Sequence, residues 1–143
     1  TKASGKPLYI VVNDKSHRLG IRVPHPIHAA VLATSAQTAD TRRLAVAARD
    51  AAALDSARTA LHRLFPAIPP AAATQVLGHA FQKFSGRVGR TAQMGLEEKV
   101  RLAVRAHVRH VETEYEGLLK SGLGRKEARR KVWGKVEEVV RGW

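Results

Sequence analysis

The residues of this sequence best suited to chemistry are arginines and lysines grouped where phosphate can be held. Residues 85–91 (SGRVGRT) combine two glycines, which allow tight turns, with Arg87 and Arg90, whose guanidinium groups suit paired hydrogen bonds to phosphate. The segment lacks the Lys-Ser/Thr ending of a nucleotide-binding P-loop, so we do not expect nucleotide hydrolysis. Two interpretations stay open: a clamp for a phosphate backbone, or a tight loop whose arginines cap the preceding helix.

Two further groups of cations lie toward the C-terminus. Arg101, Arg105 and Arg109 recur at every fourth residue, which predicts one basic stripe along a helix. Five cations crowd the start of the predicted last helix: Arg125, Lys126, Arg129, Arg130 and Lys131. Cations at the start of a helix oppose its dipole, and a feature that costs local stability favours another use, such as phosphate contact. For any single arginine the alternative is a solvated surface, with the glutamates of residues 112–116 pairing some charges.

Histidines provide the other candidate chemistry. His107 and His110 are three residues apart, but a metal site needs further ligands and the sequence has no Cys, so we predict no metal and no cofactor. His107 falls on an apolar stripe, which favours a hydrogen-bonded core histidine. Tyr115 shares this stripe, and its hydroxyl group is expected to pair with His107 or with His79.

A phosphodiester-cleaving site is the enzymatic alternative. His110, Glu114 and Arg87 supply a base, an acid and a stabilising cation, but nothing in their spacing makes them converge. No Ser/His/Asp grouping or pair of catalytic carboxylates can be identified. We therefore predict a protein that is not an enzyme and keep a nuclease as the alternative.

Composition points to a polyanionic partner. The 143 residues hold 25 Lys+Arg against 12 Asp+Glu, a formal net charge of +13. Both halves are basic, and a hydrophobic fraction of 44% allows a core, although one thinned by its many alanines. No apolar run approaches the ~20 residues of a membrane span. Because the sequence begins at Thr1 without Met, it is compatible with a removed upstream segment such as a transit peptide.

Sequence patterns predict the elements that must position these residues. Residues 8–12 and 17–23 form a hairpin that needs helices or a partner to pack against. The fold is predicted to be mainly α, with three to five helices and this N-terminal β-hairpin. A boundary at the prolines divides an N-terminal extension, 1–68, from a basic three-helix domain, 69–143. Helices are expected over 27–36, from about 41 to 65, 71–84, 96–119 and 125–141.

Apolar stripes predict which faces of these helices are buried. The long Ala-rich helix should use Leu44, Leu54, Leu61 and Phe65. The helix over 71–84 should bury Val76, Leu77, Ala80, Phe81 and Phe84, and the helix over 96–119 should bury Val100, Val104, His107, Val111, Tyr115 and Leu118. The last helix should bury Ala128, Val132, Val136, Val139 and Trp143.

Several segments resemble one family. They are FPAIPP (65–70), GHA (78–80), SGRVGRT (85–91), LAVRAHVRH (102–110), TEYEGLL (113–119) and the closing residues 124–143. Together they resemble domain-of-unknown-function family 2293 over about residues 65–143. Phe84 replaces a Gly that is usual in the family, and TEYE replaces the commoner TDYD. The resemblance implies a compact helical module and supplies no function.

The function expected from these observations is binding of nucleic acid, with RNA preferred over DNA. No helix-turn-helix signature or dimer zipper is present, and none of the seven aromatic residues interleaves with cations on a strand. We therefore expect contact with the phosphate backbone by an RNA- or rRNA-binding component of a ribonucleoprotein, such as an organellar ribosome, alongside other proteins. The expected location is intracellular, in a mitochondrial or other organellar matrix, with the nucleus as an alternative. A basic protein-interaction or membrane-surface module is a further alternative.

Overall fold

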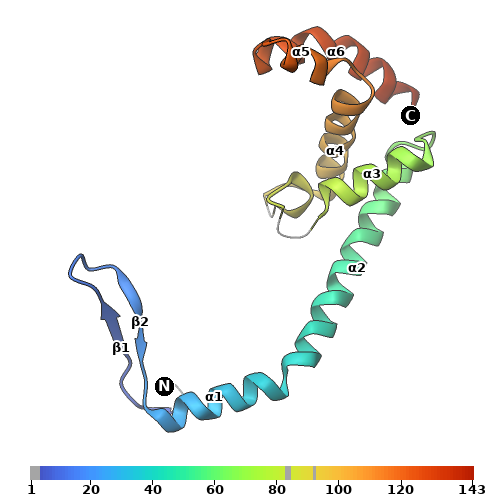
Figure 1. Cartoon of the computed structure of the whole chain (residues 1–143). Coiled ribbons are helices and arrows are strands. Elements are labelled where there is room, and N and C mark those ends of the chain that lie inside the picture. Colours follow the sequence, from blue (N-terminus) through green and yellow to red (C-terminus); the bar gives the residue numbers. More distant parts are fainter. Residues whose placement is uncertain (1–3, 83–84, 92) are drawn as a thin grey trace. The chain divides into compact units, whose positions relative to one another are not determined.

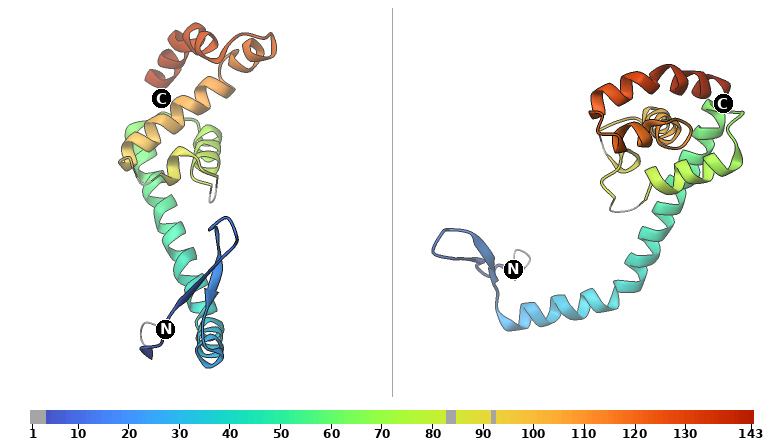
Figure 2. Two further views of the ribbon diagram at one scale, coloured as in Figure 1. Left: turned by 90° about the vertical axis from the view of Figure 1, so that its left-hand side faces the viewer. Right: turned by 45° about the horizontal axis from the view of Figure 1, so that its top comes forward.

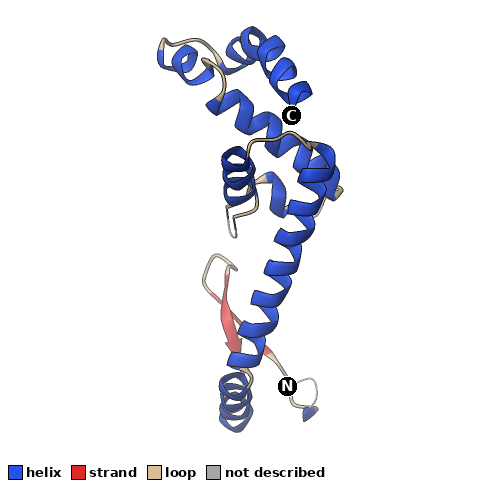
Figure 3. Cartoon of the chain, turned by 90° about the vertical axis from the view of Figure 1, so that its right-hand side faces the viewer, coloured by secondary structure: helices blue, strands red, loops and turns tan. Residues whose placement is uncertain are grey.

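The computed structural model describes residues 4–82, 85–91 and 93–143, and helices dominate it (Figures 1 and 3). The fold is mainly α with one N-terminal two-stranded hairpin, as the sequence predicts. The structure divides into two compact units, Thr1–Ala48 and Arg49–Trp143. The sequence analysis placed its boundary at residue 68. The elements are β1 (Tyr9–Val12), β2 (Arg18–Arg22), α1 (His25–Gln37), α2 (Ala39–Leu64), α3 (Pro70–Ala80), the short 3₁₀ helix η2 (Val88–Arg90), α4 (Leu96–Val111), α5 (Tyr115–Lys120) and α6 (Arg125–Gly142).

The first unit has secondary structure but no core. The antiparallel strands pair Tyr9 with Arg22 and Ile10 with Ile21, and the Asn13 side chain closes their turn by accepting the Lys15 and His17 backbone N–H groups. Among its described residues none is buried, and Ile21 keeps 48% of its surface exposed. The hairpin therefore does not find, in the described chain, the packing surface that its apolar residues were expected to need.

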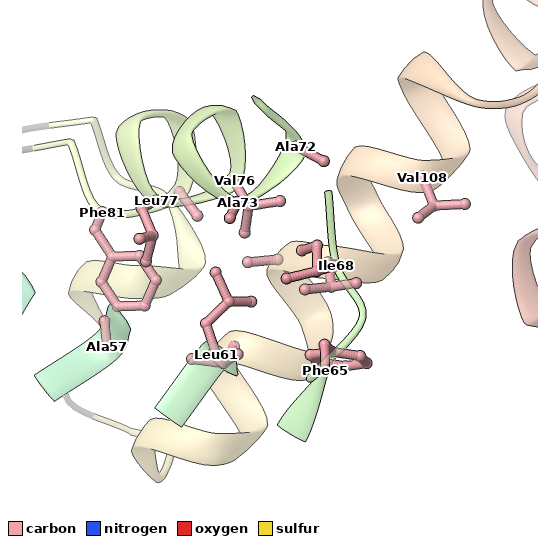
Figure 4. Packing of buried hydrophobic residues seen from close by; sticks show 14 of the residues in the cluster. Ala57, Leu61, Phe65, Ile68, Ala72, Ala73, Val76, Leu77, Phe81 and Val108 are labelled. Carbon is pink, nitrogen blue, oxygen red and sulfur yellow. The ribbon is translucent and has the colours of Figure 1, made fainter. Parts of the chain in front are cut away.

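The second unit contains the core. Leu61 of α2 extends toward the face of α3 that carries Ala73 and Val76 (Figure 4). α4 packs against both α3 and α6 (Figure 2). Its Val104 is fully buried. The remaining buried side chains come mostly from Ala and Val, which agrees with the thin core expected from composition.

The predicted stripe of α2 is correct only near the C-terminal end of the helix. Leu61 and Phe65 are buried and Leu54 is half-buried, but Leu44 keeps 72% of its surface exposed. The hydrophobic spacing is the same in both parts, and only the later turns contribute residues to the core cluster. α3 ends at Ala80, earlier than expected, and the predicted burial of Phe84 lies outside the described residues.

The prediction of one helix over 96–119 is wrong. The helix is interrupted after Val111, because the Thr113 hydroxyl donates to the Arg109 carbonyl oxygen at 2.6 Å and accepts the Tyr115 N–H at 3.2 Å. Such local bonds replace the regular helical ladder. Val111 consequently keeps 56% of its surface exposed, although it was placed on the apolar stripe, whereas Tyr115 is buried at the start of α5.

The last helix matches its predicted face. Ala128, Val132 and Val136 are buried, and Val139 and Trp143 pack half-buried against the core. The chain end is fixed because the Ala67 N–H donates to the Trp143 carbonyl oxygen at 2.6 Å. In the part of the chain that the structure describes, no helix is both long and apolar enough to cross a membrane.

Candidate nucleic-acid interface

The loop arginines cap the helix that precedes them. The Arg87 Nη1 donates to the carbonyl oxygen of His79 at 3.2 Å and to the Gln82 side chain at 2.5 Å. The Arg90 Nε donates to the Phe81 carbonyl oxygen at 2.8 Å, and its Nη1 lies 3.0 Å from an Asp50 carboxylate oxygen. These carbonyls end α3, where orphan acceptors and the negative end of the dipole favour cations. Of the two interpretations of this loop, the structure supports the cap.

The loop fits closely under the end of α3 because of one glycine. Gly89 is buried, and a Cβ atom placed on it would lie 2.6 Å from the Ala80 carbonyl oxygen and 2.8 Å from the Phe81 ring. Real side chains do not approach so closely, so only glycine fits this close backbone contact. The residue keeps Arg90 within reach of both of its acceptors.

Two of the three stripe arginines on α4 also have partners within the protein. The Arg105 Nη2 donates to Glu137 Oε2 at 3.2 Å, and its Nε lies 3.1 Å from Oε1 in an ion contact that is not aligned as a hydrogen bond. The Arg109 guanidinium lies 5.4 Å from the centre of the Tyr115 ring. The predicted uniform basic stripe is therefore divided, because only Arg101 remains fully exposed, near the Glu97 carboxylate.

Arg109 also connects α4 to the cations of α6. Burial, followed by the positive charge of Arg129, lowers the pKa of the Arg109 guanidinium, and Tyr115 acts in the opposite direction. Arginine stays protonated in proteins, so the positive charges of Arg109 and Arg129 repel each other. The Arg109 Nε is buried without a hydrogen-bond partner among the described residues.

The start of α6 carries a dense group of cations that are unpaired in the described part of the chain. None of them makes a hydrogen bond or ion pair with another residue in the described part of the chain, and all five are exposed. The N-cap residue Gly124 offers no side-chain cap, so the first N–H groups of α6 also lack a side-chain acceptor. We call this set the α6 basic cluster: Arg125, Lys126, Arg129, Arg130 and Lys131.

A groove of about 960 Å³ lies between α3 and α4. His79, His107, His110 and Arg87 line it together with alanines and valines. Burial lowers the pKa of His107, with a smaller lowering from His79 opposed by Glu112. Among the described residues no group of three His, Asp or Glu side chains is placed to hold a metal ion.

The predicted partners of these histidines differ from the observed ones. His107 Nε2 is buried without a hydrogen-bond partner among the described residues, so it is not the hydrogen-bonded core histidine that was expected. The Tyr115 ring meets His110 edge-on, with ring centres 5.0 Å apart, and no bond to His107 or His79 is present in the described chain. His107 instead lies beside Trp143, with ring centres 6.1 Å apart.

The candidate cleavage residues are brought together only in part. Arg87 and His110 line the same groove, as the nuclease alternative requires. The carboxylate beside His110 belongs to Glu116, whose Oε1 lies 2.5 Å from Nδ1, and not to Glu114, which sits at the N-cap of α5. The Arg87 guanidinium already donates to the His79 carbonyl oxygen at the end of α3.

One residue that the sequence analysis did not single out completes the surface of α6. Trp133 keeps 57% of its surface exposed, and the Arg105 guanidinium lies 6.0 Å from its ring centre. The available signal was its spacing, since Trp133 follows Arg129 and Arg130 by one helical turn. The aromatic pattern expected for base stacking lies on strands, whereas Trp133 lies on a helix.

Comparison with known proteins gives a family and no function. No curated protein and no solved structure is significantly similar to the chain. One family model, described as "Uncharacterized conserved protein (DUF2293)", matches residues 60–143. The match begins near the C-terminal end of α2 and includes the capped loop, α4 and the α6 basic cluster, which agrees with the resemblance seen in residues 65–143. The chain therefore belongs to the DUF2293 family.

Proposed function

We propose that the protein is a nucleic-acid-binding structural protein, an RNA-binding component of a ribonucleoprotein, and that the α6 basic cluster contacts the phosphate backbone. The observation that carries the proposal is the group of five exposed, unpaired cations on the first two turns of one helix. Positive charge there works against the helix dipole, and Glu127 is the acid of the first turn. A polyanion removes this cost, because each phosphate neutralises cations that the protein leaves uncompensated.

Two neighbouring features support the same surface. The first backbone N–H groups of α6 have no side-chain cap, and such groups are good donors to phosphate. The positive charge of Arg129 lowers the pKa of Arg109, and a phosphate bound near the two would reduce their repulsion. The proposed interface does not include Arg87, Arg90 and Arg105, because their guanidinium groups already donate to acceptors within the protein.

The proposal is tested by titrating structured RNA with the full chain over a range of salt concentrations. The log–log slope of affinity against salt should be about −0.7 to −0.9 per phosphate neutralised. A duplex DNA of equal length tests the preference for RNA, which should bind more tightly. A flat salt response of the wild-type chain contradicts the proposal.

A charge-matched pair of variants locates the interface. One variant changes the α6 basic cluster to Gln, and the other changes five exposed cations elsewhere: Lys6, Lys15, Arg18, Arg22 and Lys120. Both variants remove five positive charges from the net +13, so general attraction falls equally. We expect a much larger loss of affinity and salt slope in the cluster variant. Equal losses in the two variants would show that the charge acts without a specific surface.

A further inference from the structure

Trp133 stands out from the other aromatic residues of the second unit. Phe65, Phe81 and Tyr115 are buried, at 5%, 7% and 2% exposure, and Trp143 is half-buried against the core. Trp133 keeps 57% of its surface exposed on a helix whose other exposed residues are mostly charged. Its ring adds little to the core, so the fold does not account for a tryptophan at this position.

The position of Trp133 continues the α6 basic cluster. Arg129 and Arg130 precede it by four and three residues, and Lys126 precedes Arg129 and Arg130 by the same spacing. Residues three or four apart lie on the same side of a helix. Trp133 therefore shares one face of α6 with Lys126, Arg129 and Arg130.

An ion pair lies beside the ring. Glu137, one turn beyond Trp133, holds the Arg105 guanidinium with both carboxylate oxygens at 3.1 and 3.2 Å. That guanidinium in turn lies 6.0 Å from the centre of the indole ring. Trp133 is thus an exposed aromatic surface with a cation beside it.

We infer that Trp133 stacks against an unpaired nucleobase of the nucleic acid whose phosphates bind the α6 basic cluster. The inference rests on the proposed function and adds a class of ligand, a single-stranded segment such as a loop, bulge or strand end. Stacking on an indole ring tolerates every base, so it adds affinity without base-sequence specificity. Bases inside a duplex are stacked on each other and do not offer a free face to the ring.

The test compares a labelled single-stranded oligo(U) with an RNA duplex of equal length, using the full chain and fluorescence anisotropy. Trp133→Ala should weaken single-strand binding about 5- to 150-fold, the loss expected for one stacked base, and change duplex binding less than about twofold. Trp133→Phe should retain most of the affinity, because a smaller ring still stacks. Tyr9→Ala is the matched control, since Tyr9 is an aromatic residue of similar exposure, 60%, in the first unit.

A second readout separates stacking from a structural effect. Indole fluorescence of the wild-type chain should be quenched by oligo(U), and Trp133→Phe, which leaves Trp143 in place, should abolish most of that quenching. The inference is overturned if Trp133→Ala binds both RNAs as tightly as wild type, an outcome that favours a protein partner for this ring. It is also overturned if both RNAs lose affinity equally. If the wild-type chain binds neither RNA, the proposed function fails instead.

Discussion

The loop of residues 85–91 and the first two turns of α6 are both basic and have opposite physical roles. Both are short, basic and preceded or interrupted by glycine, and both lie at the end of a helix. In the loop, Arg87 and Arg90 donate to carbonyl oxygens at the end of α3. In α6, the cations of the basic cluster have no partner in the described part of the chain.

The difference follows from which end of the helix the cations meet. The C-terminal end of α3 presents carbonyl oxygens and negative partial charge, so arginines there stabilise the fold. The N-terminal end of α6 presents N–H groups and positive partial charge, so cations there oppose it. The comparison teaches that a basic motif indicates a ligand only when the protein itself leaves its charges unpaired. Substitutions in the loop should cost stability, and substitutions in the cluster should cost binding.

The largest effect is expected from Gly89→Ala. The added methyl group would meet the Ala80 carbonyl oxygen at 2.6 Å, so the loop must move and lose its caps, at a cost of about 3 kcal/mol in the free energy of unfolding. Gly78→Ala on α3 is the control, because a Cβ there meets nothing within 4 Å and alanine favours the helix. Urea denaturation measures both. Equal stability of Gly89→Ala and wild type would contradict the close packing of the loop.

A smaller loss is expected when one loop cation is removed. Arg90→Ala removes the hydrogen bond to the Phe81 carbonyl oxygen and the contact with Asp50, both partly shielded from solvent, which should lower the free energy of unfolding by about 1.5 kcal/mol. Arg130→Ala in the α6 basic cluster should change it by less than about 0.5 kcal/mol. Denaturant midpoints of the two variants make the comparison. A larger loss in the free energy of unfolding for Arg130→Ala than for Arg90→Ala would contradict the comparison between the two regions.

Reversing a charge in the cluster should stabilise the fold while it weakens binding. Lys126→Glu replaces a cation in the first turn of α6 with an anion that the dipole favours, a gain of about 0.5 kcal/mol. Arg141→Glu, in the last turn of the same helix, should lose a similar amount. Thermal melting of both variants gives the signs. A destabilised Lys126→Glu would mean that this lysine has a structural partner.

The smallest effect is a pH dependence confined to the loop side of the molecule. Burial holds the pKa of His107, which lines the groove with Arg87, below its ordinary value of 6.5. Between the lowered pKa of His107 in the folded chain and its ordinary value in the unfolded chain, the unfolded chain binds more protons. The free energy of unfolding therefore falls as the pH drops through this window. Above 6.5 both states are neutral and the histidine contributes nothing.

Urea midpoints at pH 7.5 and 5.5 measure this dependence. His107→Gln should reduce the difference between the two pH values, whereas His28→Gln, on exposed α1, should leave it unchanged. An unchanged pH dependence in His107→Gln would contradict the burial of the imidazole.

Sequence patterns predicted the elements well and the roles of their polar residues poorly. The period of the apolar residues located α6 and its buried Val132 and Val136, because spacing alone defines a helical face. The break after Val111 was missed, because a single hydroxyl group, that of Thr113, ends the helix. In a sequence the same threonine reads as an ordinary helical residue.

The sequence predicted that the candidate site consists of cations, but it did not predict which cations belong to it. All ten predicted cations were treated alike, yet Arg105 is held by Glu137 and Arg90 by Asp50, residues 32 and 40 positions away. Such pairings depend on how α2, α4 and α6 pack, which no local spacing reports. Trp133 was missed for the opposite reason, since its helical spacing from Arg129 and Arg130 was visible throughout.

The most direct test of the central claim is lysine reactivity in the complex with RNA. The full chain, free and bound to structured RNA, is acetylated briefly, and the modified lysines are quantified by mass spectrometry. We predict that RNA protects Lys126 and Lys131 of α6, while the exposed Lys15 and Lys120 react at the same rate in both states. Protection of Lys15 or Lys120, with Lys126 and Lys131 still reactive, would contradict the account.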